Sequence, residues 1–460
     1  MSRRRVLVAV VVAIAVTLAA CGSSGKTSAG GGGGGTTATT TPHVVSKTLG
    51  RGVTATTIKL GIALVDFNCI AQFVDQVREN QQEVYQSFIN DVNDKGGING
   101  RKIVPDFKTY CPTTAVSALN VSICTAFSDD DKVFAVIGNI SDAGQDDAII
   151  KCLAKNHNTP VMTFNLSQAL MKTSPPGMVI FPGTAPERSD TVLFRLLQQR
   201  GTLTGKKVAV LAQASTEAAV KSVILPQMKK LNIAAGTPAY LSISGTDTTA
   251  AHAQLASFIE RWKSENINAV YIAGEDVVVP QFVQQLVAGL PGALLMTDVG
   301  DALRSGQDET HSKVVPNPYQ GMLIAGGFSP TDYIKTDKWL KYCKPVYEKY
   351  THKVAPDALA KVPGPGGKQL DTYGSINDAC QLVGLFRDIV TKMGPYVNTE
   401  NWVATVDTIG EVTNYGGGPY ASLVAGKYDF DDTFQLQEFD PTLPPNGNWK
   451  SLTQYENISK

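Results

Sequence analysis

Polar side chains directly follow two short apolar runs that the sequence predicts to be buried β-strands. In open parallel sheets, ligands bind beside the carboxyl ends of the strands, where loop amides and helix N-termini donate hydrogen bonds to anions. The candidates here are Ser141 and Asp142 after Val133–Gly138, and Asn165, Leu166 and Ser167 after Val161–Phe164. They predict a site for reversible binding of a small molecule, although Asp142 and Ser167 are equally well placed to be helix N-caps.

A second set of candidates follows the predicted strands of the later half of the chain. It contains an amide and an acid after Lys207–Ala212, one acid after Ala269–Ala273 and one after Leu294–Thr297, which are Gln213, Glu217, Glu275 and Asp298. A carboxylate at such a position either binds a cationic group or is simply solvated. Phe67 follows the first strand, where it either lines the site or packs into the core.

No motif in the sequence predicts catalysis. The patterns G-x-S-x-G, H-E-x-x-H and G-x-x-x-x-G-K-[ST] do not occur. Residues 364–368 resemble a phosphate-binding loop, but they contain Pro365 and follow no predicted strand, so an ordinary loop is expected. The five histidines are scattered and no C-x-x-C pair occurs, which argues against a zinc site. We expect no enzyme activity, cofactor or metal.

The composition excludes other classes of protein. The chain has 460 residues, with 41 Lys+Arg and 41 Asp+Glu, so its formal net charge is zero. Binding to the phosphate backbone of a nucleic acid needs an excess of basic residues, which is absent. The chain also exceeds the roughly 250–300 residues at which a single hydrophobic core stops growing. We therefore expect at least two lobes.

The N-terminus has the pattern of an export signal. Arg3, Arg4 and Arg5 precede the apolar run Val6–Val16, which is shorter than the about 20 residues of a membrane-spanning helix. The following Leu-Ala-Ala-Cys, residues 18–21, resembles the lipobox of bacterial lipoproteins, in which the cysteine is lipidated. This resemblance implies a signal peptide of residues 1–20 and lipidation of Cys21. An ordinary secretory signal with an unrelated cysteine is the alternative.

Residues 21–54 predict a flexible tether. They are rich in Gly and Thr and cannot bury enough apolar surface to offset the entropy of ordering. A coil of this length averages roughly 30 Å from end to end. With a lipidated Cys21, it would hold a globular domain close to the extracytoplasmic face of the bacterial cell membrane.

The other six cysteines indicate disulfides. An even number of cysteines in an exported chain is typical of disulfide bonding, although sequence alone leaves the pairing open. These residues are Cys69, Cys111, Cys124, Cys152, Cys343 and Cys380.

Strands and helices alternate along the globular part. Apolar, β-branched runs predict strands at Thr57–Leu64, Lys102–Thr109, Val133–Gly138 and Val161–Phe164, with helices between them, the first at Ala71–Lys95. The same alternation restarts after Pro182 and continues to Leu294–Thr297. Later helices are expected at Lys335–Tyr350, Thr372–Met393 and Thr399–Thr408. Alternation of this kind predicts an α/β fold with two Rossmann-like lobes built on parallel sheets.

Two segments of the sequence resemble a known family. They are Gly52–Gly61, which reads GVTATTIKLG, and Asn93–Ile103, which reads NDKGGINGRKI. With the intervening helix they resemble the type I periplasmic binding proteins, particularly the branched-chain amino-acid (Leu-Ile-Val-type) substrate-binding lipoproteins of ABC transporters. The resemblance covers roughly residues 52–440.

The resemblance implies two lobes joined by three hinge crossings near residues 183, 327 and 426, with the ligand bound between the lobes. Lobe I would comprise residues 55–183 and 327–426, and lobe II residues 184–326 and 427–460. In the family's sheet order, Cys69 would meet Cys111, Cys124 would meet Cys152, and Cys343 would meet Cys380.

The family also implies roles for the candidate site residues. Ser141 and Ser167 would bind a ligand carboxylate, and Asp298 would face a ligand ammonium group. This sequence departs from the amino-acid binders because Glu217 and Glu275 stand near positions that are commonly aromatic. The resemblance therefore implies capture of a small polar ligand, an amino acid or a related solute, for an ABC permease. A ligand sensor or an interaction lipoprotein of the same fold is the alternative.

Overall fold

The computed structural model describes most of the chain from Val44 onwards. The described residues are 44–70, 76–78, 80–111, 122–140, 148–164, 166–242, 249–273, 280–297, 317–358, 360, 362–443 and 448–459. The predictions for the signal peptide and for residues 21–43 of the tether, including Cys21, lie outside these residues, as do those for Ser141, Asp142, Asn165, Glu275 and Asp298.

The first sheet contains five parallel strands of the described chain in the order β3-β1-β4-β5-β6. Their bounds are β1 Thr57–Val65, β3 Lys102–Tyr110, β4 Ala135–Gly138, β5 Val161–Thr163 and β6 Val179–Ile180. In register, Leu60 lies opposite Pro105 on one side and Ala135 on the other. Six consecutive residues of β1 are buried because helical segments cover both faces, which explains the unbroken apolar run.

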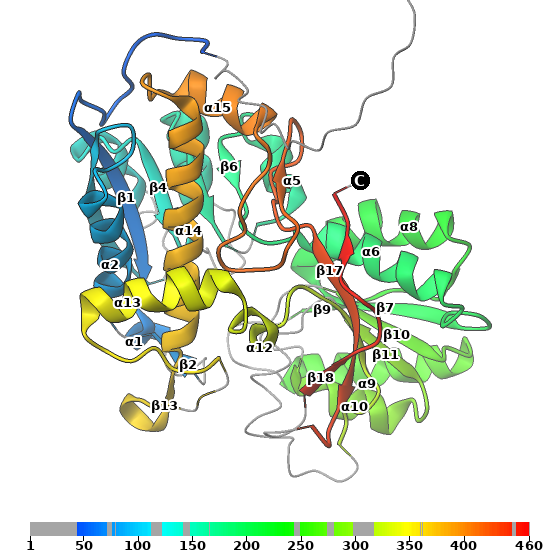
Figure 1. Cartoon of the computed structure of the whole chain (residues 1–460). Coiled ribbons are helices and arrows are strands. Elements are labelled where there is room, and N and C mark those ends of the chain that lie inside the picture. Colours follow the sequence, from blue (N-terminus) through cyan, green and yellow to red (C-terminus); the bar gives the residue numbers. More distant parts are fainter. Residues whose placement is uncertain are drawn as a thin grey trace, which may run out of the picture. The chain divides into compact units, whose positions relative to one another are not determined.

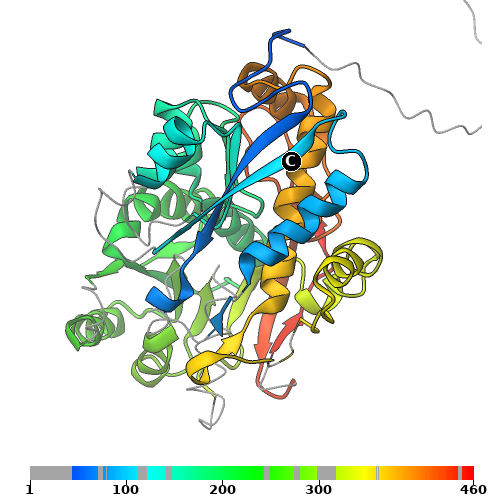
Figure 2. The same ribbon diagram turned by 90° about the vertical axis from the view of Figure 1, so that its left-hand side faces the viewer.

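Helices from two distant parts of the sequence cover this sheet. Helices α2 (Gln81–Asp94), α13 (Lys344–Thr351) and α14 (Thr372–Met393) pack together, and α14 also contacts β4 and α15 (Thr399–Thr408). Figure 2 shows α2 and α14 on one side of β1 and β3, with the cyan and teal helical segments on the other. Those segments are η1 Ala126–Asp130, α4 Ala148–Lys151 and η2 Cys152–Asn156.

The second sheet is built mainly from the middle of the chain. Its order is β18-β17-β12-β11-β10-β7-β8, and β9 and β19 pair with β7 and β17. The bounds are β7 Lys207–Gln213, β8 Ala234–Ala235, β9 Ala239–Leu241, β10 Ala269–Ala273, β11 Leu294–Thr297, β12 Leu323–Gly326, β17 Thr433–Asp440, β18 Asn448–Ser451 and β19 Glu456–Asn457. Strands β7 to β12 run parallel, whereas β17 is antiparallel to β12.

Each sheet has its own apolar core, so the fold has two lobes. The lobe I core draws on residues 58–185 and 333–430, and the two lobe II clusters draw on residues 192–325 and 434–458. The lobe II helices are α6 Pro186–Gln199, α7 Glu217–Ala219, α8 Leu225–Lys230, α9 Thr249–Ser264 and α10 Pro280–Gly289, with η3 Ala214–Thr216 and η4 Val220–Ile224. Figure 1 labels helices and strands of both α/β lobes. The predicted fold class is confirmed.

Three crossings connect the lobes. The first (residues 181–185) links β6 to α6, the second (327–329) links β12 to α12 (Pro330–Tyr333), and the third (424–432) links β16 (Ser422–Leu423) to β17. The first and third crossings are hydrogen-bonded to each other: Phe181 N–H donates to Tyr428 O and Phe430 N–H donates to Phe181 O, at 2.9 and 3.0 Å. Asp431 N–H donates to Gly183 O at 3.2 Å, so these two crossings form a paired ribbon.

The predicted helix Ala71–Lys95 is wrong at the described residues 76–78 and 80. Helix α2 begins only at Gln81, because Asn80 adopts a left-handed conformation with φ 56°. Before it, β2 (Gln76–Val77) pairs with β14 (Gln369–Leu370), which also pairs with β13 (Val362–Pro363). Arg78 anchors this small sheet through ion pairs with Asp371 and Asp378. Strand pairing with β14, which is far away in sequence, thus replaces the predicted helical structure at Gln76–Val77.

The remaining short elements are α1 Phe67–Ile70, α5 Gln168–Thr173, η6 Trp339–Cys343, η7 Pro365–Gly367 and β15 Gly410–Glu411. Residues 364–368, which resemble a phosphate-binding loop in sequence, form the turn around η7 between β13 and β14. In the predicted helix Lys335–Tyr350, helical structure starts at Asp337 and continues through η6 and α13. Strand β16, next to the third crossing, pairs with β15.

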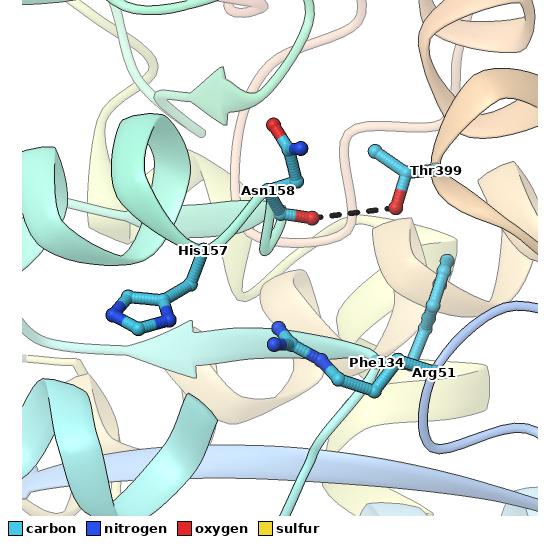
Figure 3. Close-up of a pocket in the computed structure, with 5 residues that line it drawn as sticks. All are labelled: Arg51, Phe134, His157, Asn158 and Thr399. Carbon is cyan, nitrogen blue, oxygen red and sulfur yellow. Dashed lines mark hydrogen bonds between the residues drawn. The ribbon is translucent and has the colours of Figure 1, made fainter. Parts of the chain in front are cut away.

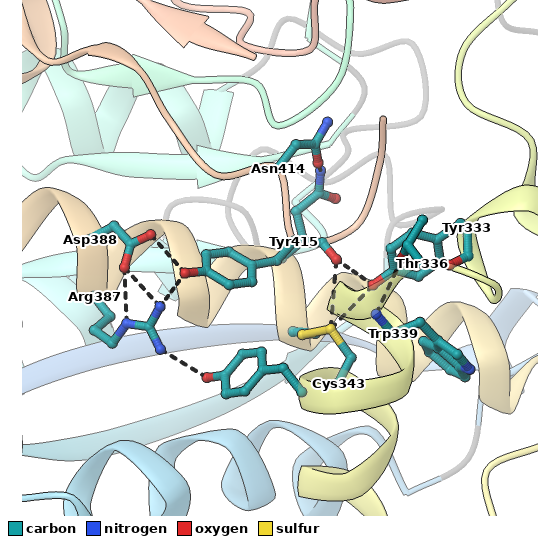
Figure 4. Close-up of a disulfide and its surroundings, with 11 residues drawn as sticks. Tyr333, Thr336, Trp339, Cys343, Arg387, Asp388, Asn414 and Tyr415 are labelled. Carbon is teal, nitrogen blue, oxygen red and sulfur yellow. Dashed lines mark hydrogen bonds and ion pairs between the residues drawn. A yellow bond between two sulfur atoms is a disulfide. The ribbon is translucent and has the colours of Figure 1, made fainter. Parts of the chain in front are cut away.

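Three disulfides join the six cysteines in the pairs that the family resemblance implied. They are Cys69–Cys111, Cys124–Cys152 and Cys343–Cys380, with Cα–Cα distances of 6.0, 6.1 and 5.7 Å. The last of them links η6 to α14 beside a polar and aromatic cluster (Figure 4). There, Arg387 lies over the rings of Tyr342 and Tyr415 and pairs with Asp388.

Candidate functional site

The loop after β4 leaves the sheet through a position that only glycine tolerates. Gly138 has φ 132°, and a Cβ atom there would collide with the carbonyl oxygen of Ala63. The next residues are held by side chains from neighbouring strands. Tyr110 OH donates to Asn139 O at 2.8 Å, and Thr163 Oγ1 accepts from Ile140 N–H at 2.7 Å. The first described residues of this loop are therefore fixed at the carboxyl edge of the first sheet.

Two of the predicted site residues in lobe I contribute to its packing. Phe67, in α1, is partly buried and packs against the lobe I core. Leu166 is fully buried in that core, so only its backbone is available to a ligand. Phe67 and Leu166 therefore support the carboxyl edge of the first sheet by packing.

Ser167 caps helix α5. Its Oγ accepts a hydrogen bond from Leu170 N–H at 3.1 Å, which satisfies one of the free amides of the first turn. The amide of Gln168 is also occupied, because Glu187 Oε2 accepts from it at 2.9 Å. Glu187 belongs to α6 of lobe II and is 4% exposed. A carboxylate of the protein itself thus occupies the anion-binding end of α5.

The described candidates on lobe II follow β7. Gln213 is the last residue of that strand and is partly buried. Glu217 lies in the first turn of α7 and forms an ion pair with Lys221 at 2.5 Å, while its side chain remains 41% exposed. Lys221 also lies over the ring of Tyr240, 5.9 Å from the centroid. Glu217 therefore belongs to an accessible charged patch.

A buried network of opposite charges joins α6 to the third crossing. Arg188 Nε lies 2.7 Å from Asp429 Oδ2 and its Nη1 lies 2.6 Å from Asp432 Oδ1. Lys427 Nζ approaches the same oxygen of Asp432 to 2.9 Å. Burial and the neighbouring Arg188 lower the pKa of Lys427. Because the two acids are matched by two bases, this part of the network is neutral.

Asp431 lies next to this network but is not neutralised by it. Its Oδ1 accepts from Thr433 N–H at 3.0 Å, and Arg188 reaches only its backbone oxygen. The residue as a whole is partly exposed. Desolvation raises the pKa of Asp431 to about 6, against the opposing effects of the Thr433 hydrogen bonds and of the charge of Arg188.

Lys338, which immediately precedes η6, is a desolvated cation whose pKa is affected by the charge of Asp431. Its Nζ donates to the carbonyl oxygen of Gly418 at 2.9 Å. Desolvation lowers the pKa of Lys338, and the charge of Asp431 opposes that shift. Lys338 and Asp431 are both described residues, yet no ion pair within 4.0 Å joins them.

A small pocket lies elsewhere, at the amino end of the first sheet. It has a volume of about 150 Å³ and is lined by Arg51, Phe134, His157, Asn158 and Thr399 (Figure 3). Phe134 immediately precedes β4, so this is the edge opposite to the carboxyl ends of the strands. Arg51 donates there to the backbone oxygens of Ser128 and Val133. The pocket does not include any predicted site residue.

One group of potential metal ligands occurs among the described residues. The side chains of Cys124, Cys152 and His157 lie within 4.8 Å of one another. Both sulfur atoms belong to a disulfide, which leaves no thiolate to bind a metal. His157 Nδ1 instead approaches Asp129 Oδ1 to 3.3 Å.

The sequence analysis missed Glu187, Lys338 and Asp431. The signal for Asp431 was available, because the acidic run Asp429–Asp432 directly follows the position expected for the third crossing. Glu187 and Lys338 carried no such signal, since each is an ordinary helix residue in a polar sequence context.

The fold defines this molecule as a two-lobe binding protein: two α/β lobes joined by three crossings, with polar residues at the strand edges and at the crossings. Its sequence matches the model of a periplasmic binding protein family over residues 76–361. The chain belongs to that family. Membership implies an extracytoplasmic location and a solute-binding rather than an enzymatic class. No helix among the described residues is long and apolar enough to cross a membrane.

Solved structures with this fold include several solute-binding proteins. A branched-chain amino-acid ABC transporter protein from Thermus thermophilus with bound valine has a TM-score of 0.60 and 11% identity, covering 88% of this chain and 98% of its own. A solute-binding protein of an ABC transporter from Rhodopseudomonas palustris BisB5, in complex with 3,4-dihydroxybenzoic acid, has a TM-score of 0.59 and 13% identity over 88% and 98%.

A third structure is the leucine-, isoleucine-, valine-, threonine- and alanine-binding protein from Brucella ovis in a closed conformation. It has a TM-score of 0.61 and 10% identity, covering 87% of this chain and 95% of its own. No curated protein matches the sequence. At these identities the structural likeness establishes the fold.

Proposed function

We propose that this protein is a lipid-anchored, extracytoplasmic solute-binding protein that captures a small polar ligand between its lobes for an ABC importer. The observation that carries the proposal is membership of a periplasmic binding protein family together with two separate cores joined by crossings. Hinged lobes can close around a solute, and a ligand that prefers the closed form shifts the molecule towards it.

The neighbouring structures support an anionic or zwitterionic ligand. Their bound molecules are valine in one and 3,4-dihydroxybenzoic acid in another, both of which carry a carboxylate. In this chain the N-terminus of α5 is already occupied by Glu187, so a ligand carboxylate has to find other donors. We therefore propose that the ligand is an amino acid or a related polar solute bound with a different set of contacts.

A ligand screen tests the binding function. Purified protein is heated with amino acids, amides, polyols, polyamines or hydroxybenzoates, and the melting temperature is recorded. A ligand at a hundredfold excess over its Kd stabilises the folded state by about 2.7 kcal/mol, which is readily detected. A specific, saturable rise with one chemical class supports the proposal. No rise with any class would contradict it.

The lipid anchor needs a separate test. The full-length chain and its Cys21→Ala variant are expressed in a bacterium, and their distribution between membrane and soluble fractions is compared. We expect the parent in the membrane fraction and the variant released. Retention of Cys21→Ala on membranes after a high-salt wash would reject lipidation while leaving the binding function intact.

A further inference from the structure

We propose that residues 44–51 form a strap that docks the amino edge of the first sheet onto the lipid bilayer through exposed aliphatic side chains. This inference rests on the lipid anchor proposed above and adds a membrane-contacting surface to it. Ligands bind beside the carboxyl ends of parallel strands. Contact of the opposite edge with the bilayer therefore leaves the binding loops of lobe I facing away from the membrane.

Two buried asparagines at the start of α15 hold the strap by its backbone. Asn401 Oδ1 accepts from Val45 N–H and Ser46 N–H at 2.7 and 3.0 Å, and Asn401 Nδ2 donates to Ser46 O at 2.7 Å. Asn398, the N-cap of α15, donates from Nδ2 to Thr48 O at 2.7 Å. These bonds use the backbone of the strap, so they fix its position without engaging its aliphatic side chains.

The strap continues along the amino edge of the first sheet. Gly50 N–H donates to Val397 O at 2.8 Å, and the Arg51 guanidinium donates to Val133 O and to Thr159 Oγ1. Val133 and Thr159 each lie two residues ahead of a strand, β4 and β5 respectively. Figures 1 and 2 show the dark blue segment at the end of lobe I where α15 lies. The strap is therefore attached to this edge at several points.

Three aliphatic side chains of the strap are exposed. Val44, Val45 and Leu49 are 37%, 57% and 41% exposed, and they are three of the eight large hydrophobic residues that are exposed in the described part of the chain. Clustered exposed apolar side chains mark interaction surfaces, whereas isolated ones need no explanation. Only residues 22–43 separate the strap from Cys21, so a lipid on that cysteine keeps a bilayer within reach. Tethering raises the effective concentration of a partner, which makes weak contacts count.

The charges of the amino edge are mixed. Lys47, on the strap, and Lys132 are exposed cations, whereas Asp129, Asp130 and Glu400 are exposed acids. Because both signs are present, the contact depends on buried apolar area rather than on attraction to anionic lipid. Docking should therefore occur on neutral phosphatidylcholine vesicles and should not weaken as the salt concentration rises.

An added tryptophan tests the contact with the bilayer. The full-length lipidated protein carrying Val45→Trp is reconstituted in phosphatidylcholine vesicles with or without brominated acyl chains, which quench tryptophan on contact. Val354→Trp is the matched control, because Val354 is 82% exposed in the lobe I segment that follows α13. The native tryptophans are buried, so the added ring reports on its own position; they are Trp262, Trp339, Trp402 and Trp449.

The fluorescence added by Val45→Trp should be quenched at least twofold by the brominated chains, and that added by Val354→Trp should be unchanged. Equal quenching of the two would overturn the proposal. Flotation of the vesicles checks the anchor separately. Protein that does not float would contradict the lipid anchor and the docking together, whereas floating protein without quenching at position 45 would overturn the docking alone.

Asn398→Asp tests the attachment of the strap. Aspartate keeps the cap acceptor for Asn401 N–H but cannot donate to Thr48 O. Hydrogen exchange at the amides of Val45 and Ser46 should therefore accelerate at least tenfold. Asn90→Asp, on α2 of the same lobe, is the matched control and should leave this exchange unchanged. Unchanged exchange in Asn398→Asp, or exchange in the parent as fast as in an unfolded peptide, would overturn the attachment.

Discussion

The two lobes are stabilised in different ways. All six disulfide-bonded cysteines lie in segments that contribute to lobe I, whereas residues 186–326 and 433–460 contain no cysteine. Lobe II relies on apolar packing, with fully buried Trp262, Tyr271 and Phe282 in its clusters. Covalent links limit the unfolded ensemble, whereas packing stabilises only the folded state. We therefore expect lobe II to be the first to open when its packing is damaged.

The largest effect is expected from Phe282→Ala. Phe282 is fully buried in α10 and makes an edge contact with His252, with ring centroids 4.7 Å apart. Its truncation leaves a cavity and should destabilise the protein by about 3–5 kcal/mol. Hydrogen exchange should show protection lost mainly in residues 249–297 of lobe II. Equal loss in both lobes would contradict the difference between them.

Removal of one disulfide should weaken lobe I by a smaller amount. The double variant Cys343→Ala, Cys380→Ala breaks the link between η6 and α14 and should cost about 2–4 kcal/mol in denaturant unfolding. Exchange should increase in α13 and α14, with the lobe II sheet unaffected. The converse control is the Phe282→Ala variant treated with a thiol reductant. Because all three disulfides lie in lobe I, reduction should increase hydrogen exchange in lobe I and leave that of lobe II unchanged.

Asp431→Asn should stabilise the unliganded protein, on the order of 1–3 kcal/mol at neutral pH. Because burial raises the pKa of Asp431 from 3.8 to about 6, the folded state binds a proton more readily than the unfolded state. The carboxylate therefore destabilises the fold as pH rises from about 4 to 6, and the cost is constant above that range.

The groups facing Asp431 are Thr433, Arg188, Asp432 and Lys338, and none of them changes in the Asn variant. Urea unfolding at several pH values should thus show the variant and parent alike at pH 4 and diverging by pH 7. A variant that is less stable at pH 7 would mean that the carboxylate is structural. Higher stability of the variant at pH 7 would show that folding does not need this carboxylate.

The smallest effect is expected from Ser167→Ala, which removes the cap of α5 and should cost about 0.5–2 kcal/mol. Ser167→Asn retains an N-cap acceptor and should restore most of the stability. Thermal melts of the three proteins check this. If both variants bind ligand as the parent does, Ser167 acts only as a cap; weaker binding in both would support the ligand role that the family resemblance implied.

Much of the fold was predictable because its elements are locally encoded. Helices Thr372–Met393 and Thr399–Thr408 have the predicted bounds, and their N-caps Asp371 and Asn398 accept backbone hydrogen bonds in the first turn. Within Ala71–Lys95, Gln76–Val77 was mispredicted as helix because β14, almost three hundred residues later, supplies a strand partner for it. Hydrophobic periodicity within a segment carries no information about a strand partner so far away in sequence.

The sequence by itself determined the two-lobe α/β class, since this depends on local patterns of strands and helices. Its composition shows no excess of basic residues of the kind that nucleic-acid binding needs, and the six cysteines other than Cys21 form an even set. Only the tertiary structure decided which charges are compensated. Arg188 forms ion pairs with Asp429 and Asp432 across more than two hundred residues, and its charge also opposes the rise in the pKa of Asp431, which lies between them in sequence. Charge compensation depends on distance and desolvation in the folded chain, and neither quantity is written in the order of the residues.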